Sequence, residues 1–572
     1  MADNLLDKAS ILLTPTAHDN GKMLSIKPTN GDGDFTFSRN SAATRVNAQG
    51  LVENVQILSG DLVQNGSFSE IGAEEVTNGS FTNGSTDWTF VGGAELTEQG
   101  ARIYSSSGGQ SYINQDALTN TKSYKISYDI VDSTQGALKL INVNGVSDYP
   151  IPSTVGSHIV YFTANNNTLF IYRNSGATDV TITNISVKEV GQNWTFGDGF
   201  TPDQANSKAT CDGTQSAATN LTQTISTNIQ NKLVRVSFTL DYTAGVLLGS
   251  LSGTGAVDFN NITSSGTYTA EMTSNEVNPP LILQGDTNFI GSITNIVLLE
   301  VTNDTNLPRI NYENGCGSWL LEPQSTNIYL NSETLSTQDN TTLASTYTVS
   351  FYGTGTITFS GTHTGSLVGT SLTDRVSATF TATAGTLTST VTGTVTKGQL
   401  EQQSYATSYI PTSGATSTRL RDLATDSGNS TLINSTEGVL YFEAKTDELN
   451  VGSISINDGT ASNRITARFR SDISKIQLSI IGSTDDFNLN SDAITLLDYN
   501  KIAIIYDNGD YYFFINGVKS SVQSRGTFSA NTFTQLDFNR GGGGEVFYGK
   551  VKALAVYKEA LTDAELTALT TI

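Results

Sequence analysis

A unit of about 105 residues occurs twice between residues 60 and 302, and this repeat constrains the fold more than any other feature of the chain. Trp88-Thr89-Phe90 recurs as Trp194-Thr195-Phe196, and the segment 183–190 recurs as 294–301. Both ends of the unit are therefore duplicated. A repeated segment of this length predicts two homologous β-sandwiches.

A shorter repeat precedes the first unit, where Asn65-Gly66-Ser67-Phe68 recurs as Asn78-Gly79-Ser80-Phe81. Inside both units, apolar and polar residues alternate as they do in half-buried strands. The strands expected from this pattern include 123–130, 137–140 and 169–172 in the first unit and 233–240 in the second.

Composition extends this prediction to the whole chain of 572 residues, which is long enough for four or five domains. Only 15% of the residues are charged, and Thr, Ser, Asn and Gly supply most of the polarity. β-Branched residues favour strands, while Asn and Gly accept the positive φ of tight turns. We therefore predict an all-β, multi-domain chain of jelly-roll β-sandwiches.

Three further segments, 34–53, 308–327 and 399–422, carry long and uncommon strings. They contain F-S-R-N-S-A-A-T-R-V-N, P-R-I-N-Y followed by L-L-E-P-Q-S-T-N, and Q-L-E followed by Y-A-T-S-Y-I-P-T. In order and wording they resemble bacteriophage virion proteins, fibre and spike proteins among them. The resemblance covers roughly residues 1–58 and 306–425 and carries no catalytic motif. About 250 residues separate its first two segments, so we expect extra domains inserted into one split frame.

Two arginines of the first segment, Arg39 and Arg45, flank a short polar stretch. Guanidinium groups pair bidentately with carboxylates, so we expect them to clasp acids such as Glu53 or Glu322. A functional anion site is the alternative.

Residues 335–402 alternate strictly and predict a third, smaller, Thr-rich sandwich. The C-terminal stretch contains Y-F-F-I-N-G, G-K-V-K-A-L-A-V-Y and A-L-T-D-A-E-L. These strings resemble the concanavalin-like, laminin-G-like lectin jelly roll, a likeness specific for fold and weak for ligand. The expected domains are 1–58 (N-terminal docking segment and first part of the frame), 59–190 and 191–303 (the two homologous sandwiches), 304–424 (central frame segment with the small sandwich) and 425–572 (lectin jelly roll).

The opening N-G-S-F…W and closing I-T-N-I-S-V-K-E-V of the repeated units resemble carbohydrate-binding jelly-roll modules. In such modules sugars stack on exposed aromatic rings, which makes Trp88, Tyr104 and Tyr112 candidate binding residues. For Trp88 a place in the core is the preferred interpretation, because Trp194 occupies the same place in the second unit.

In the lectin-like region, Asn457 and Asp458 are loop residues of the type that holds calcium or orients a sugar. The following glycine makes an ordinary hairpin turn the alternative. We predict no cofactor, with Ca²⁺ left open, and leave the metal ligands unassigned. Cys211 and Cys316 match no metal pattern and give no reason to expect a disulfide.

The net charge of −23 disfavours nucleic acid and anionic membranes as partners. No run of 18 apolar residues suits a membrane span, and the first 13 residues lack the pattern of a secretory signal. The short apolar N-terminus, residues 1–30, is expected either to dock onto another virion protein or to pack on a neighbouring domain.

With three histidines in three different regions, no catalytic constellation can be assembled, and we predict a protein that is not an enzyme. The expected function is that of a structural component of a phage particle, in the head or in a tail fibre or spike. It would lie on the outer surface of the virion and adhere to bacterial surface glycans through lectin-like domains. The resemblance implies a homotrimer. The alternatives are a secreted bacterial adhesin and a tail-spike polysaccharide depolymerase, which would need two suitably spaced acids.

Overall fold

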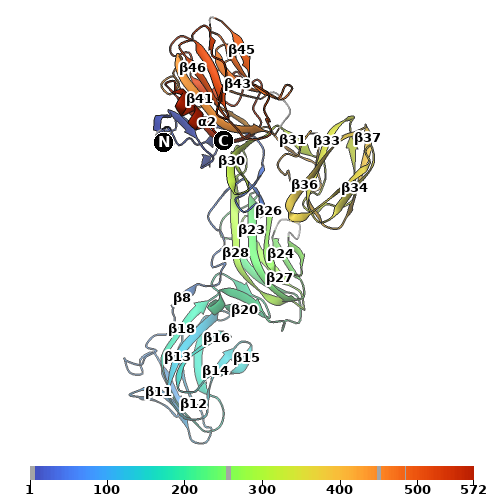
Figure 1. Ribbon diagram of the computed structural model, residues 1–572. Coiled ribbons are helices and arrows are strands. Elements are labelled where there is room, and N and C mark those ends of the chain that lie inside the picture. Colours follow the sequence, from blue (N-terminus) through green and yellow to red (C-terminus); the bar gives the residue numbers. More distant parts are fainter. Residues whose placement is uncertain (1–4, 6, 253–258, 448–451, 484) are drawn as a thin grey trace. The chain divides into compact units, whose positions relative to one another are not determined.

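The computed structural model describes residues 5, 7–252, 259–447, 452–483 and 485–572, and nearly all regular structure in them is β-strand (Figure 1). The chain forms two compact units, one of residues 1–57 with 303–572 and one of residues 58–302. The all-β prediction is confirmed. The second unit is the segment that the sequence places between the halves of the split frame.

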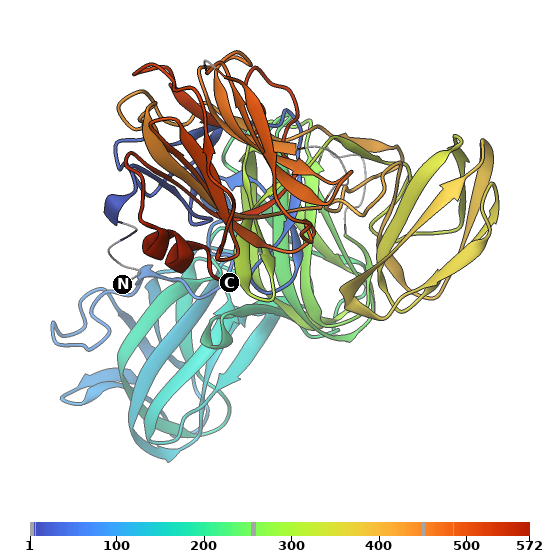
Figure 2. The ribbon, with the colours of Figure 1, turned by 45° about the horizontal axis from the view of Figure 1, so that its top comes forward.

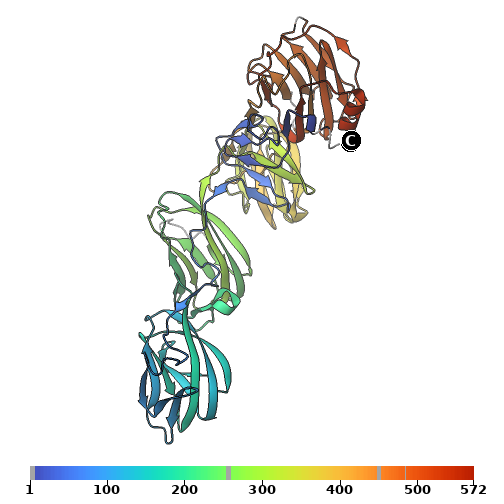
Figure 3. The same ribbon diagram turned by 90° about the vertical axis from the view of Figure 1, so that its left-hand side faces the viewer.

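The first sandwich of the 58–302 unit has two antiparallel sheets, whose layers are seen in Figure 3. Its strands are β8 (Ile71–Glu74), β9 (Thr89–Gly92), β10 (Ala94–Thr97), β11 (Gly100–Ser105), β12 (Ser111–Asp116), β13 (Ser123–Gln135), β14 (Leu138–Val143), β15 (Val146–Ile151), β16 (Gly156–Thr163), β17 (Thr168–Arg173) and β18 (Thr178–Val190). One sheet has the order β10-β11-β18-β13-β16, with β8 added to β18, and the other β15-β14-β17-β12-β9. Alternate residues of both sheets, such as Ile126 and Ile171, fill the core between them.

The second sandwich repeats this architecture. Its strands are β19 (Thr195–Phe196), β20 (Phe200–Asp203), β21 (Lys208–Cys211), β22 (Thr219–Thr224), β23 (Leu233–Ala244), β24 (Leu247–Leu251), β25 (Phe259–Ile262), β26 (Gly266–Thr273), β27 (Pro280–Gly285) and β28 (Ile290–Asn303), with the short helix η1 (Gln204–Asn206). The sheet orders are β20-β21-β28-β23-β26 and β19-β22-β27-β24-β25. Val63 and Phe68, which precede the first sandwich in the chain, belong to the core of the second. The first sandwich is thus inserted into the second, whereas the sequence placed a simple boundary at residue 59.

The repeated motifs build the same closing contact in each sandwich. In the first, Gly79 lies so close to the chain that a Cβ there would sit 1.8 Å from the carbonyl oxygen of Ile185. The Ile185 amide donates to the Gly79 carbonyl at 2.9 Å. Phe81 packs on Trp88 with ring centroids 5.5 Å apart. We call this arrangement the clasp, because it ties the segment before the sandwich to its last strand.

The clasp of the second sandwich uses the equivalent residues. A Cβ at Gly66 would sit 1.9 Å from the Ile296 carbonyl oxygen, and the Ile296 amide donates to Gly66 at 3.0 Å. Phe68 packs on Trp194 at 5.3 Å. The spacing of N-G-S-F, Trp and the closing strand is therefore set by one tertiary contact made twice.

The C-terminal lectin-like domain belongs to the other unit and is built on two sheets. Its strands are β1 (Ile11–Leu13), β29 (Arg309–Glu313), β30 (Cys316–Leu321), β41 (Glu437–Thr446), β42 (Gly452–Asn457), β43 (Arg464–Arg470), β44 (Lys475–Ile481), β45 (Phe487–Asn490), β46 (Asn500–Asp507), β47 (Asp510–Ile515), β48 (Val518–Lys519), β49 (Gln523–Ser524), β50 (Gln535–Asp537) and β51 (Gly549–Tyr557). The first sheet runs β29-β30-β51-β41-β46-β47-β48, with β1 beside β51 and β49 beside β47, and the second β45-β44-β43-β42-β50. The hairpin β29–β30, predicted to lie in the 304–424 domain, is part of the lectin sheet.

Both faces of the first lectin sheet are covered, which explains why its strands are nearly continuous apolar runs. Ile504 and its alternates face the second sheet, while Ile505 and its alternates face helix α2 (Asp563–Thr570). Figure 2 shows α2 beside this sheet. The N-terminal residues Leu5 and Leu12 complete the outer layer.

The N-terminal segment therefore packs on the lectin-like domain of the same chain. β1 pairs antiparallel with β51, and Ile11 and Leu13 are fully buried. This arrangement agrees with the expectation of a segment packed on a neighbouring domain. Docking of the N-terminal segment onto another virion protein stays a prediction.

The small Thr-rich sandwich has sheets β32-β37-β34-β35 and β36-β33-β38 around a core that includes Tyr329 and Phe351. Its strands are β32 (Gln338–Thr342), β33 (Ser345–Gly353), β34 (Thr356–Gly361), β35 (Gly365–Val368), β36 (Ser371–Ala382), β37 (Gly385–Thr392) and β38 (Val395–Glu401). The other strands of this unit are β2 (His18–Asp19), β3 (Lys22–Met23), β4 (Phe35–Ser38), β5 (Thr44–Val46), β6 (Val52–Asn54), β31 (Ser325–Asn327), β39 (Ser417–Arg419) and β40 (Leu423–Thr425), and β7 (Ile57–Leu58) spans the boundary between the units. None of the helices in the described part of the chain has the length and apolarity needed to cross a membrane.

Candidate functional sites

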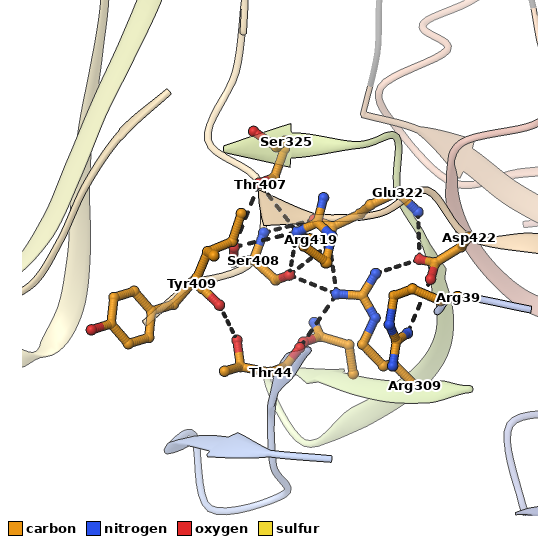
Figure 4. A network of polar contacts seen from close by, with 12 residues as sticks. Arg39, Thr44, Arg309, Glu322, Ser325, Thr407, Ser408, Tyr409, Arg419 and Asp422 are labelled. Carbon is orange, nitrogen blue, oxygen red and sulfur yellow. Dashed lines mark hydrogen bonds and ion pairs between the residues drawn. The ribbon is translucent and has the colours of Figure 1, made fainter. Parts of the chain in front are cut away.

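A buried charge centre gathers residues from all three segments that resemble virion proteins (Figure 4). Asp422 pairs with Arg39 at 3.0 Å and with Arg309. Glu322 pairs with Arg309 at 2.6 Å and with Arg419 at 2.9 Å. None of the five side chains is more than 6% exposed.

The electrostatics of this centre suit a structural role, in which buried ion pairs hold the three segments together. Burial alone would raise the pKa of Glu322, but Arg419 and Arg309, helped by hydrogen bonds from Ser408, hold it far below its ordinary range. Burial lowers the pKa of Arg39 to about 10 against the pull of Asp422, so its guanidinium remains charged at neutral pH. Removing one partner of such a pair leaves an uncompensated buried charge, which costs about 3–5 kcal/mol.

The expected arginine clasps are found in part. Arg45 Nε lies 2.8 Å from Glu53 Oε1, as predicted. Arg39 pairs with Asp422, and Glu322 is held by Arg309 and Arg419 instead. Arg39 is buried and donates to Asp422, Ser41 and Leu307, so its guanidinium is not exposed to an anion from solution.

An aromatic surface lies on the outer side of the sheet β15-β14-β17-β12-β9 in the first sandwich. Tyr112 on β12 stands opposite Tyr172 on β17, and their rings stack with centroids 4.7 Å apart and planes 14° apart. Phe170, two residues along β17, lies 5.8 Å from Tyr112. All three rings are half-buried and point outward because the residues between them, such as Ile113 and Ile171, fill the core.

Polar groups border these rings. Lys139 on β14 stands opposite Tyr172, with its Nζ 5.6 Å from the ring centroid and 2.8 Å from Asp148. Asn114 stands opposite Phe170, and its Oδ1 is buried with no hydrogen-bond partner in the described residues. We call Tyr112, Asn114, Lys139, Phe170 and Tyr172 the aromatic face.

The aromatic face has the chemistry that a sugar requires. The C–H groups of a pyranose pack on aromatic carbon, while its hydroxyls need donors and acceptors beside the rings. The phenol hydroxyls of Tyr112 and Tyr172 and the ammonium group of Lys139 supply them here.

The structure separates the predicted sugar-binding residues. Trp88 is 6% exposed, and its Nε1 donates to the carbonyls of Thr77 and Asn78 at 3.2 Å. This burial supports its place in the core and removes its ring from the surface. Tyr104 is 36% exposed but lies on β11, in the opposite sheet from Tyr112. Tyr112 alone belongs to the aromatic face.

The ring of Tyr104 is covered by a neighbouring arginine. The guanidinium of Arg102 lies 4.6 Å from its ring centroid and is itself held by Asp179 at 2.7 Å and Glu95 at 2.9 Å. These ion pairs fix the cation over the ring.

Asn457 ends β42, and Asp458 begins the loop 458–463 that joins β42 to β43. Asn457 is fully buried, accepts from the Gly459 amide at 2.7 Å and donates to Asp537 at 2.8 Å. Asp458 accepts from Thr460 and Asn463, which keep its pKa low although partial burial opposes them. Among the described residues, no group of three or more His, Cys, Asp or Glu side chains is placed to hold a metal ion.

Sequence reasoning missed Phe170, Tyr172 and Lys139. The signal available was the strand 168–173, in which Phe170 and Tyr172 occupy the outward positions between buried Leu169 and Ile171. Two aromatic residues on the solvent side of one strand are unusual enough to mark a surface.

Comparison with known proteins gives one family match. Residues 428–567 match the family described as the concanavalin A-like lectin/glucanases superfamily. The match covers the lectin-like domain, so the chain carries a lectin-like domain at its C-terminal side. No curated protein matches the chain at a significant level.

Several solved structures are similar to parts of the chain. The carbohydrate-binding module CBM40 of the Ruminococcus gnavus IT-sialidase, bound to α2,3 sialyllactose, is 21% identical, with 25% of this chain and 86% of that chain covered and a TM-score of 0.22. Domain 4 of AbnA, an extracellular arabinanase from Geobacillus stearothermophilus in complex with arabinotriose, is 16% identical over 29% and 82%, with a TM-score of 0.23. The tandem CBM22 domain of Paenibacillus barcinonensis Xyn10C is 11% identical over 43% and 100%, with a TM-score of 0.17.

Proposed function

We propose that this protein is a structural component of a bacteriophage particle that displays glycan-binding β-sandwiches on the outer surface of the virion. The observation that carries the glycan-binding part is the aromatic face, in which the stacked rings of Tyr112 and Tyr172 lie beside Phe170 and Lys139. The lectin-like domain at residues 428–567 supports the same role.

The virion part of the proposal rests on the three segments that resemble phage fibre and spike proteins. Their charged residues converge in the buried charge centre, which gives these strings a structural reason to occur together.

Weak single contacts suffice for adhesion when many act together. One shallow site gives low affinity, but several sites on one particle raise the local concentration and the overall avidity. A homotrimer, as expected of fibres, would present three aromatic faces for each copy of the assembly.

Binding to immobilised bacterial polysaccharides tests the glycan part. We expect the full chain to bind and Tyr172→Ala to weaken binding by about tenfold, the loss of roughly 1.4 kcal/mol. Binding of wild type and variant at equal strength, or no binding to any bacterial glycan, would contradict it.

Immunogold labelling of intact particles with an antibody to the C-terminal domain tests the location. Label on the particle surface is expected. Label confined to the bacterial surface would favour the secreted adhesin, and a fall in polysaccharide viscosity on incubation would favour the depolymerase.

A further inference from the structure

A second polar surface lies on the lectin-like domain, on the outer side of the sheet β45-β44-β43-β42-β50. Along β43, Ile465, Ala467 and Phe469 fill the core, so Arg464, Thr466 and Arg468 point outward. A third arginine, Arg540, reaches this side from the glycine-rich loop that follows β50. We call Arg464, Thr466, Arg468, Arg540 and Glu545 the arginine face.

One carboxylate serves two of these arginines. Arg468 holds Glu545 through Nε and Nη2, at 2.8 and 2.7 Å, and the Arg540 Nη1 lies 3.0 Å from the same carboxylate. Ser453 adds a hydrogen bond at 3.1 Å. These contacts anchor the loop over the sheet and use up both oxygens of Glu545.

Donors remain unused beside this anchor. Arg464 donates through Nη1 to the Ala461 carbonyl, but its Nε is buried and has no partner in the described residues. The Nε of Arg540 and the hydroxyl of Thr466, a fully buried residue, also lack a partner there. These buried atoms are closed to a ligand, so only the Nη groups of the half-buried Arg464 and Arg540 can reach an acceptor outside the protein.

The charge balance of this surface is positive in a chain of net charge −23. Three arginines face two carboxylates, Glu545 and Asp486. Burial lowers the pKa of Arg464, and repulsion from Arg540 and Arg468 lowers it further. An added anion would relieve this repulsion.

Arg470 shows what a satisfied arginine looks like on the same strand. Its Nε and Nη2 hold Asp472 at 2.8 and 2.6 Å. Arg470 and Arg464 therefore differ in their hydrogen-bond partners, although both lie on the same side of β43.

We propose that the arginine face binds the carboxylate of an acidic sugar, with the Nη groups of Arg464 and Arg540 as the binding groups. The planar guanidinium fork matches a carboxylate through two parallel hydrogen bonds, and an acidic sugar brings that group on a ring whose hydroxyls need neighbouring polar side chains. The inference rests on the proposed function only in taking a glycan as the ligand.

The test measures binding of the full chain to polygalacturonate, with dextran as the neutral polymer and dextran sulfate as the sulfated one. We expect salt-sensitive binding to polygalacturonate that Arg464→Gln and Arg540→Gln each weaken by about tenfold, because a hydrogen bond to a charged group is lost. Arg470→Gln is the matched control and should bind like the wild type. Unchanged melting temperatures establish that the variants are folded.

Equal binding by all three variants and the wild type, or no binding to polygalacturonate, would overturn the proposal. Equal loss of affinity for dextran sulfate would overturn the carboxylate assignment, because it would indicate a general anion surface. Tyr172→Ala distinguishes this site from the aromatic face. The variant should bind polygalacturonate like the wild type, and this result does not depend on whether the aromatic face binds a glycan.

Discussion

The two sandwiches of the 58–302 unit have the same closing contact but different outer surfaces. In both, a buried glutamine holds the segment before the sandwich: Gln115 accepts from the Thr77 amide and Gln223 from the Gln64 amide, each at 2.8 Å. These glutamines fix the equivalence of β12 with β22. The comparison can therefore be made residue by residue.

On the outer side the equivalent residues diverge. Where the first sandwich has the stacked pair Tyr112 and Tyr172, the second has Asn220 opposite Gln284, joined by a hydrogen bond of 2.9 Å. Where the first has Phe170, the second has Ile282. The second sandwich has no aromatic pair at these positions.

This difference separates the residues that close the sandwich, which are the same in both copies, from the outward residues, which differ. The clasp is the same in both copies because it satisfies backbone groups and fills a core position, and any change there is felt by the whole sandwich. The outer face carries no such constraint. An aromatic pair on one copy alone is therefore not needed to close the sandwich, in keeping with the proposed glycan binding.

The largest expected effect concerns the two tryptophans. Trp88→Ala and Trp194→Ala should each destabilise the unit by about 3–5 kcal/mol, because each removes a large buried ring and leaves a cavity. Chemical denaturation measures both. A Trp88→Ala protein of unchanged stability that had lost glycan binding would break the equivalence and restore Trp88 as a sugar-binding residue.

The next largest loss of stability is expected from substitutions of the two glycines of the clasp. Gly79→Ala and Gly66→Ala should each cost about 3 kcal/mol, since the new Cβ would overlap a carbonyl oxygen and force the backbone apart. Gly60→Ala is the control, because a Cβ there meets no atom within 4 Å. Similar midpoints of urea unfolding for all three variants would contradict the clasp.

The outer faces predict a smaller, functional effect. Tyr112→Ala should weaken glycan binding about tenfold with little loss of stability, whereas Asn220→Ala at the equivalent position should leave binding unchanged. The double variant Asn220→Tyr with Gln284→Tyr should add binding to the second sandwich. Titration with immobilised polysaccharide checks all three, and equal losses from Tyr112→Ala and Asn220→Ala would remove the distinction.

Much of this fold could be predicted from local patterns. The alternation in strands such as β13 and β23 and the repeat of Trp88 as Trp194 gave the sandwiches and their homology. The pattern could not reveal that Phe68 packs in the second sandwich and not the first, because both copies of N-G-S-F are alike and only tertiary packing assigns them.

The sites were less accessible to sequence reasoning. Tyr112 was identified from its residue type, but its partner Tyr172 lies 60 residues away and meets it only through the β12–β17 register. The unused donors of Arg464 were likewise hidden, because an arginine's partners depend on which loop covers it. Residue type predicts which interactions a side chain can make, but only the fold shows which of its hydrogen-bonding groups remain without a partner.

The smallest expected effect is a pH dependence limited to the first sandwich. A hydrogen bond from Arg102 lowers the pKa of Asp179, whereas the second sandwich has Thr210 and Ile290 at the equivalent positions. A carboxyl group with a lowered pKa stabilises the fold above its ordinary value of about 3.9 and loses this contribution as the pH falls through the folded value. Asp179→Asn should therefore lower the free energy of unfolding by less than about 1 kcal/mol at neutral pH, as the loss of a surface ion pair does. Below about pH 3 the difference in unfolding free energy between the variant and the wild type should become smaller. Urea unfolding at both pH values measures it, and a gap that widens in acid would show that Asp179 is stabilised by something other than its charge.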